Sequence, residues 1–146
     1  MAQVHTNQSL KSIFGITLMA AALGLTACST ATDPDVKARQ DSMKSYGDAM
    51  GVMGDMMKAP DTFDATVFKE QAAFLAEDAA TPWSHFENKE AVGNATDAVW
   101  SNADGFRAEA ENFQKVTAEL NAAAQTATSI DDVKPAFGEV GASCKS

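Results

Sequence analysis

The stretch that decides the fold runs from Pro34 to Lys58 and reads PDVKARQDSMKSYGDAMGVMGDMMK. Its larger side chains recur every three or four residues, which places them on one stripe of an α-helix. Asp33 before Pro34 is typical of a helix start, and Ala59-Pro60 is typical of a helix end. We therefore expect a helix over about residues 34–58, with an inward stripe of Val36, Arg39, Met43, Tyr46, Met50, Met53 and Met57.

Three glycines interrupt this helix, at Gly47, Gly51 and Gly54. Each costs about 1 kcal/mol of helix stability relative to alanine. Such a cost is tolerable where another group needs close access to the backbone. We therefore expect a neighbouring helix or a flat ligand to approach this part of the chain.

Three more helical patterns follow, and no stretch of the sequence reads as a convincing strand. A second helix is expected from Asp64, its N-cap, to a point before Thr81-Pro82. A third is expected over about residues 103–126. A fourth follows a cap within residues 129–132, and its inward positions are Val133, Phe137, Val140 and Cys144. Cys144 is therefore expected on the buried face.

The connections between these helices determine how they pack. Short loops join the first helix to the second and the third to the fourth, which makes each pair antiparallel neighbours. The longer connection, about residues 82–96, holds Trp83, His85, Phe86 and Gly93, and its aromatic side chains indicate a packed loop. The predicted fold is all-α, an antiparallel four-helix bundle over residues 36–146. The core of such a bundle commonly houses a cofactor.

The residues before the bundle resemble a bacterial export signal. An apolar run of about 13 residues, Ile13 to Leu25, is too short to span a membrane comfortably. It ends in Leu25-Thr26-Ala27-Cys28, which resembles a lipobox, whose cysteine is acylated and becomes the new N-terminus. This pattern predicts a signal peptide over residues 1–27, lipidation of Cys28, a tether over residues 28–35, and a periplasmic location anchored to the membrane through the lipid. The alternative is an ordinary signal cleaved nearby, with Cys28 incidental.

The charge balance limits the class of partner. Without residues 1–27 the chain carries 10 basic and 20 acidic residues, a formal net charge of −10. So acidic a surface repels nucleic acid and anionic headgroups and favours partners with a basic docking face. Nucleic-acid binding is therefore excluded, and contact with the membrane is expected through the lipid anchor alone.

The sequence shows none of the common catalytic patterns. It contains no HExxH motif, no phosphate-binding loop and no Ser-His-Asp set, so we do not expect an enzyme. His85 is the only histidine after the signal segment, and we interpret it as a surface or hydrogen-bonded side chain rather than a ligand. Five of the seven methionines lie in the first helix, where a flexible core stripe is favoured over a copper(I) site.

The end of the chain carries the most specific signal. Residues 137–145, Phe137-Gly138-Glu139-Val140-Gly141-Ala142-Ser143-Cys144-Lys145, closely resemble the segment that leads into the haem-attachment motif of the cytochrome c′ family. Other marks of that family agree in order and spacing over about residues 33–146. They are Arg39-Gln40 with Met43, Phe63-Asp64, Pro82-Trp83 with Phe86, and Trp100 followed by Phe106.

The resemblance implies a bundle that carries one haem c near the end of its last helix. Cys144 matches the first cysteine of Cys-x-x-Cys-His, which forms a thioether to the haem. Arg39 and Gln40 match residues that line the haem and its propionates, and Asn94 falls near a further position at the haem edge. Met43 matches the position that faces the distal side of the iron. A methionine ligand there favours electron transfer, whereas a non-ligating side chain admits small gases.

The sequence departs from the family at its last residues, because neither a second cysteine nor a histidine follows Cys144-Lys145-Ser146. We expect that the gene continues with Cys-His and that the haem motif is incomplete in this chain. The expected function is then that of a periplasmic haem c protein for single-electron transfer, or for binding small gases, with a possible homodimer through the first two helices. The alternative is a shortened relative without haem, a helical lipoprotein that acts as a binding or structural module.

Overall fold

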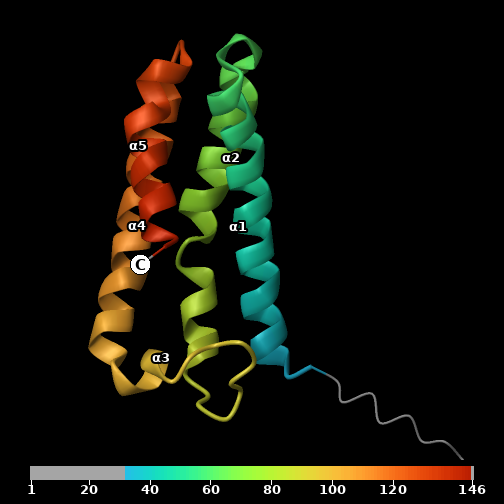
Figure 1. The fold of residues 1–146 in the computed structure, drawn as a ribbon, viewed down its shortest axis with the longest axis vertical. Helices are drawn as coiled ribbons and strands as arrows, with labels where there is room; N and C mark the ends of the chain where they lie inside the picture. The colour runs from blue at the N-terminus through green and yellow to red at the C-terminus, as the bar shows by residue number, and fades with distance from the viewer. Residues whose placement is uncertain (1–31, 146) are drawn as a thin grey trace, which may run out of the picture. The chain divides into compact units, whose positions relative to one another are not determined.

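The computed structural model describes residues 32–145, so the expected signal peptide and residues 28–31 of the expected tether, including Cys28, lie outside the described residues. Within residues 32–145 no strand is present, and four long helices lie side by side (Figure 1). They are α1 (Pro34–Lys58), α2 (Ala65–Asp78), α4 (Ala103–Thr126) and α5 (Ile130–Ser143). Helix α4 packs against α2 and α5, and α1 packs against α2. The predicted all-α, antiparallel four-helix bundle is confirmed.

The starts of the helices depend on side-chain caps. Asp33 Oδ1 accepts hydrogen bonds from two backbone N–H groups of the first turn, so α1 begins at Pro34, as the sequence pattern predicts. The last two residues of the expected tether, 34 and 35, therefore belong to the helix. Asp64 caps α2 in the same way. Ser129 is the N-cap of α5, and Asp132 completes a capping box with it. Because these signals are local, the helix starts follow closely from the sequence.

The core lies between the four helices, and each of them contributes fully buried side chains. Burying one such side chain stabilises the fold by about 1.5–3 kcal/mol. Among the largest are Met53 on α1, Phe68 and Leu75 on α2, Leu120 on α4, and Val133 and Val140 on α5. No helix within residues 32–145 combines the length and apolar character needed to cross a membrane.

The predicted inward stripe of α1 is correct except at Met43. Met57 is half-buried and packs against the core, although its neighbour Met56 is more deeply buried. Met43 is 43% exposed. Its side chain borders the two cavities described below rather than a tightly packed helix.

The glycines of α1 differ in their surroundings. A Cβ atom at Gly54 would lie 3.7 Å from Phe137 Cζ, an ordinary van der Waals contact with α5. At Gly47 and Gly51 a Cβ would meet no described atom within 4 Å. The prediction of a close approach is therefore wrong at Gly51, which is exposed, whereas Gly47 borders the cavity described below.

The long connection between α2 and α4 is packed, as its aromatic residues predict. It contains two short elements that the sequence pattern did not indicate, the 3-10 helix η2 (Thr81–Phe86) and helix α3 (Ala98–Ser101). A third short element, the 3-10 helix η1 (Pro60–Thr62), joins α1 to α2. The Trp83 indole donates to the carbonyl of Ala79 at 2.6 Å, and the Trp100 indole donates to the carbonyl of Phe86 at 2.8 Å. The first bond ties the connection to the end of α2, and the second links two parts of the connection to each other.

Gly93 fixes this connection against the start of α1. Its φ is +58°, and a Cβ there would lie 2.6 Å from Val36 Cγ1. A side chain at this position would add left-handed backbone strain to a steric clash. Gly93→Ala is therefore expected to lower the free energy of unfolding by about 2–4 kcal/mol, measured by denaturant titration.

The matched control for this prediction is Gly51→Ala. Gly51 is an exposed helical position with open space around its Cα. Alanine there is expected to raise the free energy of unfolding by about 0.5–1 kcal/mol, because it reduces the entropy of the unfolded chain. Equal effects of the two substitutions would contradict the tight contact of Gly93 with the start of α1.

Candidate functional site

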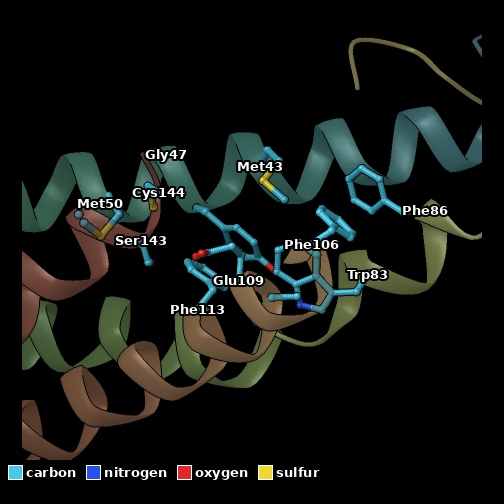
Figure 2. Close-up of a pocket in the computed structure, with 13 residues that line it drawn as sticks. Met43, Gly47, Met50, Trp83, Phe86, Phe106, Glu109, Phe113, Ser143 and Cys144 are labelled. Carbon is cyan, nitrogen blue, oxygen red and sulfur yellow. The ribbon is translucent and has the colours of Figure 1, made fainter. Parts of the chain in front are cut away.

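A cavity of about 560 Å³, which we call the main cavity, opens between α1, η2, α4 and the end of α5 (Figure 2). Its walls are mostly apolar. Helix α1 contributes Met43, Gly47 and Met50, α4 contributes Phe106 and Phe113, and Cys144 follows the last residue of α5. The cavity lies within the size range of ligand and cofactor sites.

Aromatic rings form one end of the main cavity. The Trp83 ring lies edge-on to Phe106 and Phe113, with centroid distances of 5.8 Å and 6.1 Å. The centroids of the Phe86 and Phe106 rings lie 4.9 Å apart. These rings hold one another in place and present apolar surface. Such a wall suits a flat, apolar group better than a polar substrate.

Gly47 leaves room on the opposite wall. A side chain there would enter open space rather than meet a neighbouring residue. Glycine in the middle of a helix costs stability relative to alanine, and no turn or packing contact of the described residues requires it here. Of the two close neighbours that the sequence pattern allows, a helix or a flat ligand, the position therefore fits the flat ligand.

A second cavity of about 340 Å³ adjoins the main cavity. The two cavities share Met43 and Phe86 in their linings. The second cavity is also lined by Arg39, Gln40 and Asn94. The structure thus brings Asn94, from the loop before α3, beside three residues of α1. All four residues of the predicted haem-binding set lie at one place, and Cys144 borders the adjoining cavity.

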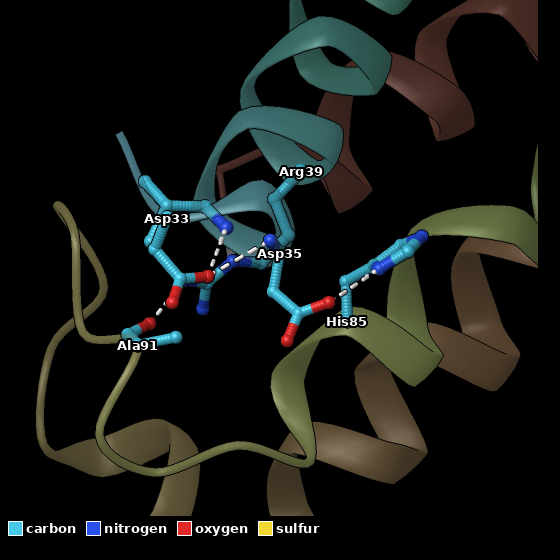
Figure 3. A network of polar contacts seen from close by, with 6 residues as sticks. Asp33, Asp35, Arg39, His85 and Ala91 are labelled. Carbon is cyan, nitrogen blue, oxygen red and sulfur yellow. Dashed lines mark hydrogen bonds and ion pairs between the residues drawn. The ribbon is translucent and has the colours of Figure 1, made fainter. Parts of the chain in front are cut away.

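Arg39 is the unusual residue of this set, because it is a charged side chain with only 5% exposure. Its Nη2 donates to the carbonyl of Ala91 (Figure 3). Its guanidinium lies 4.5 Å from the centroid of the Phe86 ring. Its Nη1 is buried and has no hydrogen-bond partner among residues 32–145. A buried guanidinium with an unused donor is costly unless an acceptor meets it. A carboxylate is the natural acceptor for such a group.

Cys144 does not lie where the helical pattern placed it. The prediction that it belongs to the buried face is wrong, because α5 ends at Ser143 and Cys144 is exposed at its C-cap. Its side chain borders the main cavity, where desolvation by the surrounding atoms raises the pKa of the thiol. The residue is therefore a protonated thiol at neutral pH, accessible and adjacent to the cavity.

Tyr46 also lines the main cavity, and the sequence pattern indicated its burial but not its partner. The phenol donates to Asp78 at the end of α2, to the backbone carbonyl at 2.6 Å and to Oδ2 at 2.9 Å. Desolvation, together with the hydrogen bond to Asp78 and its negative charge, raises the pKa of Tyr46 far above its ordinary value. Nothing in the sequence links residues 32 positions apart, so this pair could not be predicted.

His85 lies outside both cavity linings. Its Nδ1 donates to Asp35 Oδ1 at 2.9 Å, which ties η2 to the first turn of α1 (Figure 3). The interpretation of His85 as a hydrogen-bonded side chain is confirmed. Its role in this structure is to hold the connection in place.

The fold and the cavity together define a class of protein: a four-helix bundle with an apolar cofactor cavity between its helices, bordered by a cysteine at the end of the last helix. Within that class, the chain belongs to the cytochrome c′ family. A sequence model of the family described as Cytochrome C′ matches residues 35–146. Cytochromes c′ are haem c proteins, so membership implies that this protein binds haem c.

Individual relatives agree with this assignment. The cytochrome c′ of Alcaligenes xylosoxydans xylosoxydans is 34% identical over 110 residues, which cover 75% of this chain and 86% of that protein. The cytochrome c′ of Rubrivivax gelatinosus is 31% identical over 113 residues, 75% of this chain and 87% of that protein.

Solved structures show the same fold. The crystal structure of cytochrome c′ from Rubrivivax gelatinosus superposes with a TM-score of 0.68 at 29% identity, covering 76% of this chain and 88% of the other. A ferrous variant of cytochrome c prime from Alcaligenes xylosoxidans with bound NO superposes with a TM-score of 0.70 at 33% identity. That superposition covers 76% of this chain and 87% of the other.

Proposed function

We propose that the main cavity holds the haem c, attached through Cys144, and that the protein carries single electrons. One observation carries this proposal. The Cys144 thiol and the unpartnered Nη1 of Arg39 border two adjoining cavities, which share Met43 and Phe86 in their linings. A haem c needs a thiol for attachment, apolar walls for its ring and donors for its propionates. The residues present meet these three needs, whereas the second cysteine and the axial histidine of Cys-x-x-Cys-His do not follow Cys144 in residues 145–146.

The proposed roles follow from the position of each residue. Arg39, with Gln40 and Asn94 in the same cavity lining, would hold the propionates, because its buried Nη1 lacks an acceptor. Met43 lies in the lining that both cavities share and is the candidate axial ligand. When bound, haem c supplies an iron that changes between its ferrous and ferric states. The aromatic wall of the main cavity would shield the ring from water, which would help to set the reduction potential.

Among residues 32–145, Cys144 is the one cysteine, and it borders the main cavity. Neither the second cysteine nor the histidine of Cys-x-x-Cys-His lies between Cys144 and Ser146. The attachment is therefore tested on a chain in which Cys and His directly follow Ser146, which we call the extended chain. Its comparison with the chain that ends at Ser146 separates the role of Cys144 from that of the two added residues.

Met43 is expected to ligate the iron in the haem-loaded extended chain. Its side chain lines both cavities, and a thioether suits ferrous iron. The protein should then show low-spin optical and magnetic spectra, and Met43→Leu should convert them to high-spin spectra. Met50→Leu is the matched control, because Met50 lines the main cavity but not the second one, and the spin state should not change.

A second candidate function is the binding of small gases. The observation that favours it is the relative from Alcaligenes xylosoxidans with bound NO. Met43 is 43% exposed, so its side chain is not locked in one position by packing. A parent protein that is already high-spin, and that Met43→Leu leaves unchanged, would contradict ligation by Met43. It would favour gas binding at an open iron site.

We also propose that the protein works in the periplasm, anchored by a lipid on Cys28, and that its redox partner presents a basic face. The lipobox pattern and the apolar run before it support the anchor. The formal net charge of −10 after residues 1–27 supports the partner, since opposite charges steer two proteins together. Such an encounter slows as ionic strength rises.

A further inference from the structure

The position and the hydrogen bonds of Tyr46 indicate a role besides packing. The phenol belongs to the only tyrosine of the sequence, is 5% exposed, and lies in the wall of the main cavity. Its hydroxyl points to the end of α2, where Asp78 offers both a carbonyl and a carboxylate oxygen. A carbonyl accepts a hydrogen bond, but only the carboxylate can also take the proton.

The ability of the carboxylate to take the phenolic proton matters for electron transfer. A phenol that loses an electron becomes a strong acid, so its oxidation is easy only where a base accepts the proton at the same time. Asp78 Oδ2 lies 2.9 Å from the phenol oxygen, within the distance for direct proton transfer. Asp78 is half-buried and has access to solvent, so the proton can return to water.

A row of aromatic side chains that includes Tyr46 also runs from the main cavity to the surface. Tyr46 lies 5.3 Å from Phe113, which in turn contacts Trp83 in the cavity wall. On its other side Tyr46 lies 6.3 Å from Phe74, whose side chain is 37% exposed. Phe74 and Asp78 are one turn apart on α2, so the exposed ring and the proton acceptor lie on the same face of that helix.

We propose that Tyr46 is a redox-active tyrosine, which gives one electron to a one-electron oxidant in the main cavity while its proton passes to Asp78. The phenolic O–H bond breaks, a new O–H bond forms at Asp78 Oδ2, and the oxidant gains the electron. The products are a neutral tyrosyl radical, a protonated carboxyl group and the reduced oxidant. The proposal rests on the proposed function only for the natural oxidant, which would be a haem that a peroxide has oxidised beyond its ferric state, because a ferric haem c is too weak an oxidant for a phenol.

The hydrogen bonds of Tyr46 could also serve only to stabilise the end of α2, and this alternative needs its own test. Tyr46 and Trp83 both donate to carbonyls at the C-terminal end of α2, and such bonds stabilise a helix end without any redox chemistry. Asp78→Asn separates the two roles, because the amide oxygen still accepts a hydrogen bond but is not a base at neutral pH. Tyr46→Phe removes the hydroxyl and keeps the ring.

The test uses the haem-free chain with a ruthenium polypyridyl photo-oxidant coupled to Cys144, so that the oxidant sits at the main cavity. Cys28→Ser restricts the label to Cys144, since the sequence has only these two cysteines. After a flash with an external electron acceptor, we expect a tyrosyl radical by electron paramagnetic resonance and transient absorption, and none in Tyr46→Phe. In Asp78→Asn its formation should be roughly 100-fold slower, the usual worth of a positioned base. Asp78→Glu, which keeps the base, should restore part of the rate.

Two results would overturn the proposal. One is a radical confined to tryptophan in the parent chain, which would show that Tyr46 is not the electron donor. The other is formation of the tyrosyl radical at the parent rate in a folded Asp78→Asn variant, which would show that Asp78 is not the proton acceptor. Because no haem is present, neither result depends on the proposed haem site.

Discussion

The chain that ends at Ser146 is expected to carry almost no covalent haem when it is produced with the haem-attachment machinery, and the extended chain to carry about one haem per chain. The physical reason is that Cys144 alone supplies one thioether and no axial imidazole. The iron then lacks a strong ligand on its proximal side, and the ring is held at one point. Denaturing gels stained for haem peroxidase activity, with pyridine haemochrome spectra for quantity, measure the difference.

Cys144→Ala in the extended chain is the control for the site itself. It removes the thiol that borders the main cavity and leaves the added Cys and His in place. Covalent haem should fall sharply, and the remaining adduct should have the altered spectrum of a single thioether. A strong haem band on the chain that ends at Ser146 would show that this explanation of attachment is wrong. An extended chain without haem would favour the haem-free binding or structural module.

Cys28→Ala is expected to release the protein from the membrane fraction entirely. The lipid is the anchor that the sequence predicts, no helix within residues 32–145 is suited to cross a membrane, and the acidic surface repels anionic headgroups. Fractionation after feeding of radiolabelled fatty acid measures both the label and the location. The spectrum and the thermal unfolding of the variant should match those of the parent.

Cys144→Ala serves as the matched control for lipidation, since it removes the other cysteine of the sequence. It should keep the fatty-acid label and remain with the membrane. Label that persists in Cys28→Ala would show that the acyl group is attached elsewhere. A parent without label would favour the alternative of an ordinary signal segment with an incidental cysteine.

The parts of the fold that the sequence predicted are those with local causes. Helices α1 and α4 begin and end where the spacing of apolar residues and the flanking signals place them. Asp33 and Asp64 cap their helices as expected, because a cap is an interaction between residues two or three apart. The short elements η2 and α3 were missed, because a single turn is too short to show a hydrophobic period.

The residues of the site were predicted from the resemblance to a family. Their hydrogen bonds and exposure could not be predicted in this way. The bond of Arg39 to the carbonyl of Ala91 joins residues 52 positions apart, and no periodicity reports such a contact. The exposure of Cys144 follows from the end of α5, which a continued helical pattern could not show. Met43 likewise reads as a core residue, because an apolar side chain at a cavity and one in a packed core have the same spacing.

The most direct test of the proposed haem site is the position of the iron in crystals of the haem-loaded extended chain, located by anomalous scattering. We predict one iron site within the main cavity, close to Met43, with a propionate oxygen bonded to Nη1 of Arg39. An iron site outside the main cavity would contradict the proposal. So would a haem whose propionates leave Nη1 of Arg39 without an acceptor.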